Sequence, residues 1–118
     1  MKKASDFVGY LFLARDVAHS VHLNTRSFAK HMALGEYYAQ IIELVDQFAE
    51  AYMGRYEQLK KFPDEFHLEK DPVKYLDNLK DFVEEARKEL PQDSELQNLV
   101  DEIADLINST LYKLRFLN

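Results

Sequence analysis

Five side chains with metal-binding donors gather in the first half of this sequence. His19 and His22 lie three residues apart, Asp46 and Glu50 lie four apart, and His31 lies between the two pairs. On a helix, residues with these spacings share one face, so each pair could ligate one ion. Imidazole nitrogens and carboxylate oxygens are the donors used for ferrous iron, manganese and zinc. The sequence therefore contains the donors of a transition-metal site.

Distance along the chain limits how these donors can combine. His31 precedes Asp46 by fifteen residues, which is about 22 Å on one helix at roughly 1.5 Å per residue. A metal ligand must lie about 2.0–2.2 Å from the ion, so one chain cannot join these residues at a single site. Two copies of the helix lying antiparallel about a two-fold axis near Tyr38 would place His31 of one chain opposite Asp46 and Glu50 of the other. The predicted metal ligands are His22, His31, Asp46 and Glu50, with His19 or Glu43 as supporting or substitute ligands.

A simpler interpretation of the same carboxylates stays open. Acidic and amide residues recur at spacings of four and three, which is typical of the solvent-exposed face of an amphipathic helix. These residues are Glu36, Gln40, Glu43, Gln47 and Glu50. The histidines can likewise be surface or interface residues, and His67, far from the others in sequence, is given no role.

The order of residues around His31 matches a known pattern. Phe28 precedes His31 by three residues, Tyr38 follows it by seven, and the segment Asp46-Gln47-Phe48-Ala49-Glu50 begins fifteen after it. With His22 upstream, this stretch resembles the Dps-type miniferritins, the dodecameric branch of the ferritin-like superfamily.

That resemblance implies an iron-oxidising centre at a two-fold interface and a homo-oligomer. Its Fe²⁺ would be held by His22 and His31 of one subunit with Asp46 and Glu50 of its mate. Two positions depart from the family pattern: Leu23 replaces the usual Trp, and Gly35 stands where the family has an acidic ligand. Glu36 is turned about 100° around the helix from that position and is a poor substitute.

Two functional hypotheses follow. The first is a divergent Dps-like iron protein that binds Fe²⁺ at the shared site for oxidation by oxygen or a peroxide. The second is a non-catalytic helical module, for example one encoded by a phage, that keeps the scaffold for assembly or for binding a protein partner. Both predict self-association through the face containing His31, Tyr38, Ile42 and Asp46. This prediction rests on apolar residues in excess of those needed for one buried stripe on each helix, namely Val8, Phe12, Tyr37 and Ile41.

The hydrophobic pattern predicts an all-α, antiparallel, ferritin-like four-helix bundle as one domain over residues 1–118. Apolar residues at helical spacing predict helices near 7–21, 28–54, 72–90 and 94–118. The expected N-caps are Ser5, Ser27 and Asp71, and Ser94 with Gln97 fits a capping box. Residues 55–70, around Pro63, are expected to form a crossover connection with at most a short helical turn.

Composition excludes several classes of function. Without cysteine there are no disulfides, thiol nucleophiles or Cys-based metal sites. The net charge of −6, with Lys2 and Lys3 as the only basic arm, predicts no binding to nucleic acid. No segment reaches the roughly 20 apolar residues of a membrane span, and no signal peptide is evident, so the expected location is the cytoplasm.

Overall fold

The protein is a bundle of four α-helices. The computed structural model describes residues 2–62 and 71–117, and these two ranges contain no strand. The helices are α1 (Lys2–Asn24), α2 (Phe28–Arg55), α3 (Pro72–Ala86) and α4 (Ser94–Phe116), with a short 3₁₀ helix, η1 (Arg87–Glu89), after α3. The prediction of an all-α four-helix bundle is confirmed.

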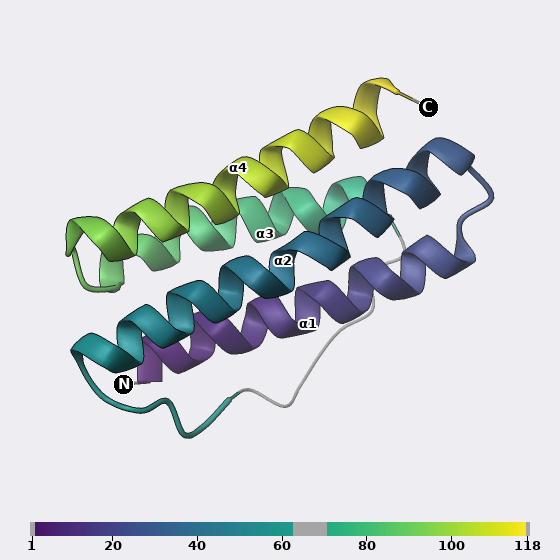
Figure 1. Ribbon diagram of the computed structural model, residues 1–118. Helices are drawn as coiled ribbons and strands as arrows, with labels where there is room; N and C mark the ends of the chain where they lie inside the picture. The colour runs from purple at the N-terminus through teal and green to yellow at the C-terminus, as the bar shows by residue number, and fades with distance from the viewer. Residues whose placement is uncertain (1, 63–70, 118) are drawn as a thin grey trace.

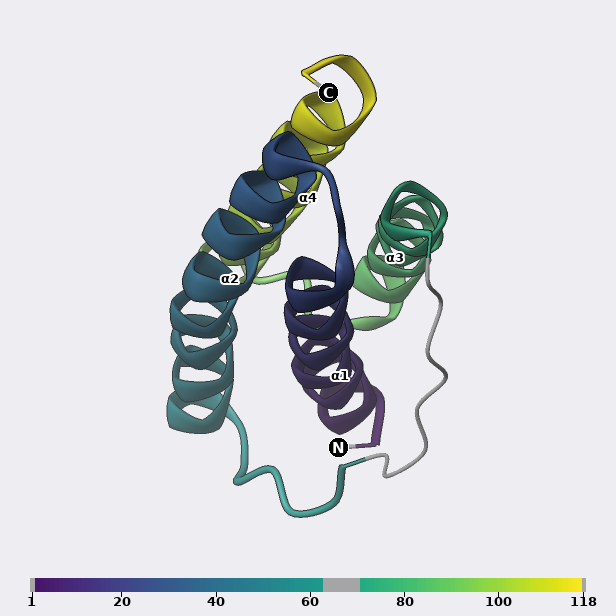
Figure 2. The same ribbon diagram turned by 90° about the vertical axis from the view of Figure 1, so that its right-hand side faces the viewer.

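Ion pairs between helices identify which ends of the bundle meet. Lys3 near the start of α1 lies 3.1 Å from Glu89 after α3, and Arg55 at the end of α2 lies 2.6 Å from Asp93 before α4. Lys113 near the end of α4 lies 2.5 Å from Glu36 of α2. Neighbouring helices are therefore antiparallel, as Figures 1 and 2 show.

The connection between α2 and α3 has to pass from one end of the bundle to the other. Helix α2 ends beside the start of α1, whereas α3 begins beside the end of α1 (Figure 1). The bundle therefore consists of two helical hairpins joined by one long crossover. Residues 56–62 of this connection form no helix, and the rest of the predicted crossover, including Pro63 and His67, lies outside the described residues.

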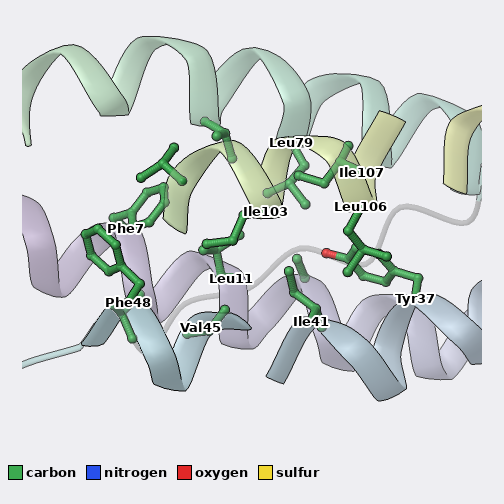
Figure 3. Close-up of a cluster of buried hydrophobic side chains, with 14 of the residues drawn as sticks. Phe7, Leu11, Tyr37, Ile41, Val45, Phe48, Leu79, Ile103, Leu106 and Ile107 are labelled. Carbon is green, nitrogen blue, oxygen red and sulfur yellow. The ribbon is translucent and has the colours of Figure 1, made fainter. Parts of the chain in front are cut away.

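Side chains from all four helices share one core. Figure 3 shows Phe7 and Leu11 of α1 facing residues of α2 and α4, with the Tyr37 ring beside Leu106. The apolar residues whose spacing predicted α1 and α4, such as Phe7, Leu11, Leu96 and Leu114, are buried, apart from a partly buried Leu99. Val8, Tyr37 and Ile41 also lie in this core, so the expectation that they supply spare apolar surface was wrong; Phe12 is partly buried.

Two predicted helix starts are confirmed by their capping hydrogen bonds. The Ser27 hydroxyl accepts a hydrogen bond from the Lys30 amide at 3.2 Å, and the Asp71 carboxylate accepts one from the Val73 amide at 3.0 Å. Pro72 follows Asp71 as the first residue of α3. These caps satisfy amides that the first helical turn leaves without partners.

The other two predicted caps were wrong, although α4 begins at Ser94 as expected. Helix α1 begins at Lys2, and Ser5 lies buried inside it. Asp93 rather than Ser94 precedes the first residue of α4, and neither makes a side-chain capping bond. The Gln97 amide instead donates to the carbonyl oxygens of Arg87 and Pro91, at 3.1 and 3.0 Å. Gln97 therefore stabilises the turn between η1 and α4.

A polar cluster closes the end of the bundle at which α2 ends and α4 begins. The Tyr56 hydroxyl donates to the Asp93 carboxylate, which also pairs with Arg55. Arg55 reaches Glu95 at 3.5 Å as well.

None of the helices within the described ranges is long and apolar enough to cross a membrane.

Candidate functional site

His22 and His31 face each other across the turn between α1 and α2. His22 lies in the last turn of α1, His31 lies in the first turn of α2, and three residues separate the helices. Within that link the Ser27 amide donates to the Thr25 hydroxyl at 3.2 Å, while Ser27 caps α2. This short, hydrogen-bonded turn fixes how the two histidines meet.

The two histidines exchange hydrogen bonds with each other's backbone. Nδ1 of His22 lies 2.6 Å from the carbonyl oxygen of His31, and Nδ1 of His31 lies 2.9 Å from the carbonyl oxygen of His22. Because a carbonyl oxygen can only accept, each Nδ1 carries the hydrogen. The His22 carbonyl is one of the last four of α1, which have no partner within the helix, so His31 also caps the end of α1.

The two imidazole rings are stacked. Their centroids lie 3.8 Å apart with an angle of 18° between the ring planes. A Cβ atom placed on Gly35 would lie 3.0 Å from Cε1 and 3.2 Å from Nδ1 of His22. The position at which the miniferritin pattern has an acidic ligand is therefore in close contact with the His22 ring. Gly35 leaves the space that this ring occupies.

Further aromatic rings extend the histidine pair along the hairpin. The His19 ring stacks on Tyr38 with centroids 4.1 Å apart, and the Tyr38 ring meets His22 edge to face at 5.2 Å. The Arg15 guanidinium lies 5.7 Å from the centroid of the Tyr38 ring. Side chains of α1 thus cover part of the Tyr38 ring, which belongs to the predicted dimer face.

The arrangement of the two rings bears directly on metal binding. An imidazole holds a metal through a nitrogen lone pair that lies in the plane of its ring. Two stacked rings whose planes differ by only 18° do not direct their lone pairs at one nearby point. In this arrangement His22 and His31 are not a chelating pair, and the rings would have to turn apart to bind one ion.

The predicted carboxylate ligands on α2 lie away from the two histidines. Helix α2 is continuous from Phe28 to Arg55, so Asp46 and Glu50 are several turns from His31, as the spacing argument requires. Both are exposed, as is Glu43, and the predicted polar face of α2 is confirmed in full. Among residues 2–62 and 71–117, no three His, Asp or Glu side chains lie together as a metal-binding group.

Sequence reasoning found both histidines but missed how they are held. Their partners are backbone carbonyl oxygens, which no side-chain pattern can mark. Gly35 gave a signal, because glycine inside a helix costs about 1 kcal/mol against alanine and so needs a reason. That reason is the close approach of His22.

These features define a class of protein: a four-helix bundle with one crossover and an N-terminal hairpin closed by two stacked histidines. Residues 22–114 match a protein family described as a family of unknown function (DUF5856), and the chain belongs to that family. It is 31% identical over 115 residues to an uncharacterized 14.6 kDa protein of the mobD-ri intergenic region of Enterobacteria phage T4. That match covers 95% of this chain and 88% of the relative. No solved structure matches the chain.

Proposed function

We propose that the protein is a non-catalytic helical module that works through contacts with another protein chain. The observation that carries this proposal is the reciprocal bonding of His22 and His31. Both Nδ1 hydrogens are used to close the α1–α2 hairpin, and the stacked rings fill the space beside Gly35. Hydrogen bonding and packing of this kind indicate a structural role for both histidines. The similarity to a phage T4 protein supports the phage-encoded origin suggested for such a module.

Metal titration tests this proposal. Protein purified without an affinity tag is titrated with Fe²⁺, Mn²⁺ and Zn²⁺ in a calorimeter, and wild type is compared with His31→Ala. We expect no stoichiometric binding by wild type, and a lower unfolding temperature for His31→Ala. The control is Arg26→Ala in the same turn, which changes an exposed side chain. Saturable Fe²⁺ binding that is lost in His31→Ala would overturn the proposal.

A second candidate is the iron site shared between two chains, and one observation favours it. Because each Nδ1 donates to a carbonyl oxygen, each neutral ring keeps its lone pair on Nε2. Histidine ligands of metals commonly have this arrangement, with the second nitrogen donating to a backbone carbonyl. Fe²⁺ would then be held by Nε2 of His22 or His31 together with Asp46 and Glu50 of a second chain.

Subunit mixing tests the shared site. The variants His31→Ala and Asp46→Ala are assayed for Fe²⁺ binding alone and after exchange of subunits. A mixed dimer carries both substitutions at one interface site and none at the other, so binding should return in part. If each variant alone binds Fe²⁺ as wild type does, the site is not shared.

Nucleic acid is not part of either proposal. The net charge of −6 makes the release of counterions from phosphate a weak driving force for this chain. Retarded migration of duplex DNA at about 0.15 M salt, the physiological ionic strength, would contradict this.

A further inference from the structure

Exposed apolar side chains concentrate at one end of the bundle. Nine large hydrophobic residues are exposed in the described ranges. Six of them lie where α1 ends, α2 begins and α4 ends: Leu23, Phe28, Met32, Tyr112, Phe116 and Leu117. We call these six residues the apolar end. The Glu36–Lys113 ion pair places the start of α2 beside the end of α4, and Figure 1 shows both at the end that carries the C-terminus.

The apolar end exposes enough area to form an interface. Leu23 and Phe116 are each 73% exposed, and Phe28 is 76% exposed. Taking roughly 150–250 Å² for an aromatic side chain and less for Leu and Met, the exposed fractions of the six residues sum to an area on the order of 600–800 Å². The largest apolar patch on a typical monomer is about 300–600 Å². A standard protein–protein interface buries about 800 Å² from each partner. The exposed area thus matches what one partner contributes to a stable dimer.

The distribution of charge favours contact at this end between two acidic chains. Glu36 and Asp77 are neutralised there by Lys113 and Arg115 of α4, at 2.5 and 2.7 Å. In the opposite half, Glu85, Glu89, Glu95 and Asp101 also pair with basic residues. Other exposed acidic residues of that half form none of the ion pairs found in the described residues, including Asp46, Glu50, Glu84 and Glu102. Two chains that meet at their apolar ends keep these acidic halves apart, which limits repulsion between two molecules of charge −6.

We propose that a second copy of this chain binds at the apolar end, so that the two chains associate end to end about a two-fold axis. A two-fold contact pairs the same patch on both chains, so apolar surface is buried against apolar surface. The rest of the described residues offers less exposed apolar surface, since only Tyr10, Tyr56 and Phe62 are exposed large hydrophobics there. A head-to-tail contact would therefore leave apolar side chains against charged ones.

This dimer differs from the one predicted through the side of α2. The side face is centred on Tyr38, whose ring is covered in part by His19 and Arg15. Ala39 is exposed and lies three residues before Ile42 and seven before Asp46 of the predicted face, so it reports on that face. The end-to-end dimer rests on the proposed role as an interaction module. The test of the end-to-end dimer measures the mass of the protein in solution, whereas the test of the proposed function measures metal binding. A monomeric protein would therefore overturn the dimer and leave the metal-binding result unchanged.

The test is the mass of the protein in solution over a range of concentrations up to high micromolar, by light scattering and sedimentation equilibrium. Wild type is compared with the double variant Phe28→Glu/Phe116→Glu and with two controls. These are Phe62→Glu, which lies away from the apolar end beside Phe12 of α1, and Ala39→Glu on the side of α2. All substituted side chains are exposed, and circular dichroism checks that each variant stays helical.

We expect wild type and Phe62→Glu to dimerise equally, and the double variant to raise the dimer Kd by about tenfold or more, which is at least about 1.4 kcal/mol. Ala39→Glu should leave the Kd unchanged. A wild type that stays monomeric would overturn the inference, as would dimerisation lost in Ala39→Glu but kept in the double variant.

A cross-link gives a second test, because the chain has no cysteine. Leu23→Cys and Leu117→Cys place a thiol at the apolar end, and Phe62→Cys places one away from it, beside Phe12 of α1. Under mild oxidation, at least one of the first two should form a disulfide-linked dimer faster than Phe62→Cys. Equal or slower rates for both would count against the end-to-end arrangement.

Discussion

His22 and His31 each donate a ring hydrogen to the other's backbone carbonyl oxygen, at 2.6 and 2.9 Å, while their rings stack. Each side chain therefore satisfies a backbone group on the other helix. Removing either one breaks one of these bonds and the ring contact together, so the two residues should act as a unit.

We expect His22→Ala and His31→Ala each to lower the free energy of unfolding by about 1–2 kcal/mol, since a net hydrogen bond contributes about 1 kcal/mol and ring packing is lost. The double variant should lose less than the sum, because the residues are coupled. Urea unfolding of all four proteins measures this. Strict additivity of the two losses would show that the pair is not a unit.

Gly35→Ala should fail to stabilise the protein although alanine favours helix. Glycine to alanine within a helix normally adds up to about 1 kcal/mol. At Gly35 the new Cβ would lie 3.0 Å from His22, so the ring must move. Gly54→Ala is the matched control, because nothing lies within 4 Å of its Cβ position on the same helix.

Urea unfolding should therefore show a gain for Gly54→Ala and a smaller gain or a loss for Gly35→Ala. In a His22→Ala background, Gly35→Ala should recover its normal gain. If Gly35→Ala stabilises wild type as much as Gly54→Ala does, moving the His22 ring away from position 35 has no cost in the free energy of unfolding.

Removing a tyrosine hydroxyl should have opposite effects at two positions. The Tyr37 hydroxyl is fully buried and has no hydrogen-bond partner in the described structure. Burial, reinforced by Tyr75, raises the pKa of Tyr37 far above its usual range. Tyr37→Phe should stabilise the fold by about 1 kcal/mol, because an unsatisfied buried hydroxyl is costly.

Tyr56→Phe makes the same chemical change where the hydroxyl donates to Asp93, and should destabilise. Thermal unfolding distinguishes the signs, since about 1 kcal/mol shifts the Tm of a domain near this size by roughly 4–8 °C. A drop in Tm for Tyr37→Phe would mean that its hydroxyl has a partner, such as an ordered water.

Stability should fall in acid partly through Asp93. The hydrogen bond from Tyr56 and the nearby Arg55 guanidinium lower the pKa of Asp93 below its usual value. A carboxylate with a lowered folded-state pKa stabilises the fold above its unfolded pKa, about 3.9. That contribution is lost as the pH falls through the folded value.

Asp93→Asn should therefore lower the free energy of unfolding at neutral pH and lessen its decline between about pH 4 and the folded pKa. Denaturant unfolding at a series of pH values measures both effects. An unchanged pH dependence in Asp93→Asn would exclude a role for this carboxylate. Glu95→Gln is the control, because Glu95 is the more distant partner of Arg55, at 3.5 Å against 2.6 Å for Asp93.

The sequence by itself determined the helices and most of the core. Apolar residues at spacings of three and four marked the buried stripe of α1, and Ser27 and Asp71 marked two helix starts. These features are local, since a cap bonds to amides two or three residues away and a helical stripe repeats within one segment. They could be predicted without knowing the partner helices.

Only the tertiary structure decided how the histidines, Gly35 and Gln97 are used. His22 and His31 bond to carbonyl oxygens nine residues away, and Gln97 reaches Arg87 ten residues away. The same spacings that suggested an iron site are compatible with this structural role, because spacing places residues on a face without fixing what approaches it. That depends on how closely α1 packs on α2, where the absence of a side chain at Gly35 admits the His22 ring.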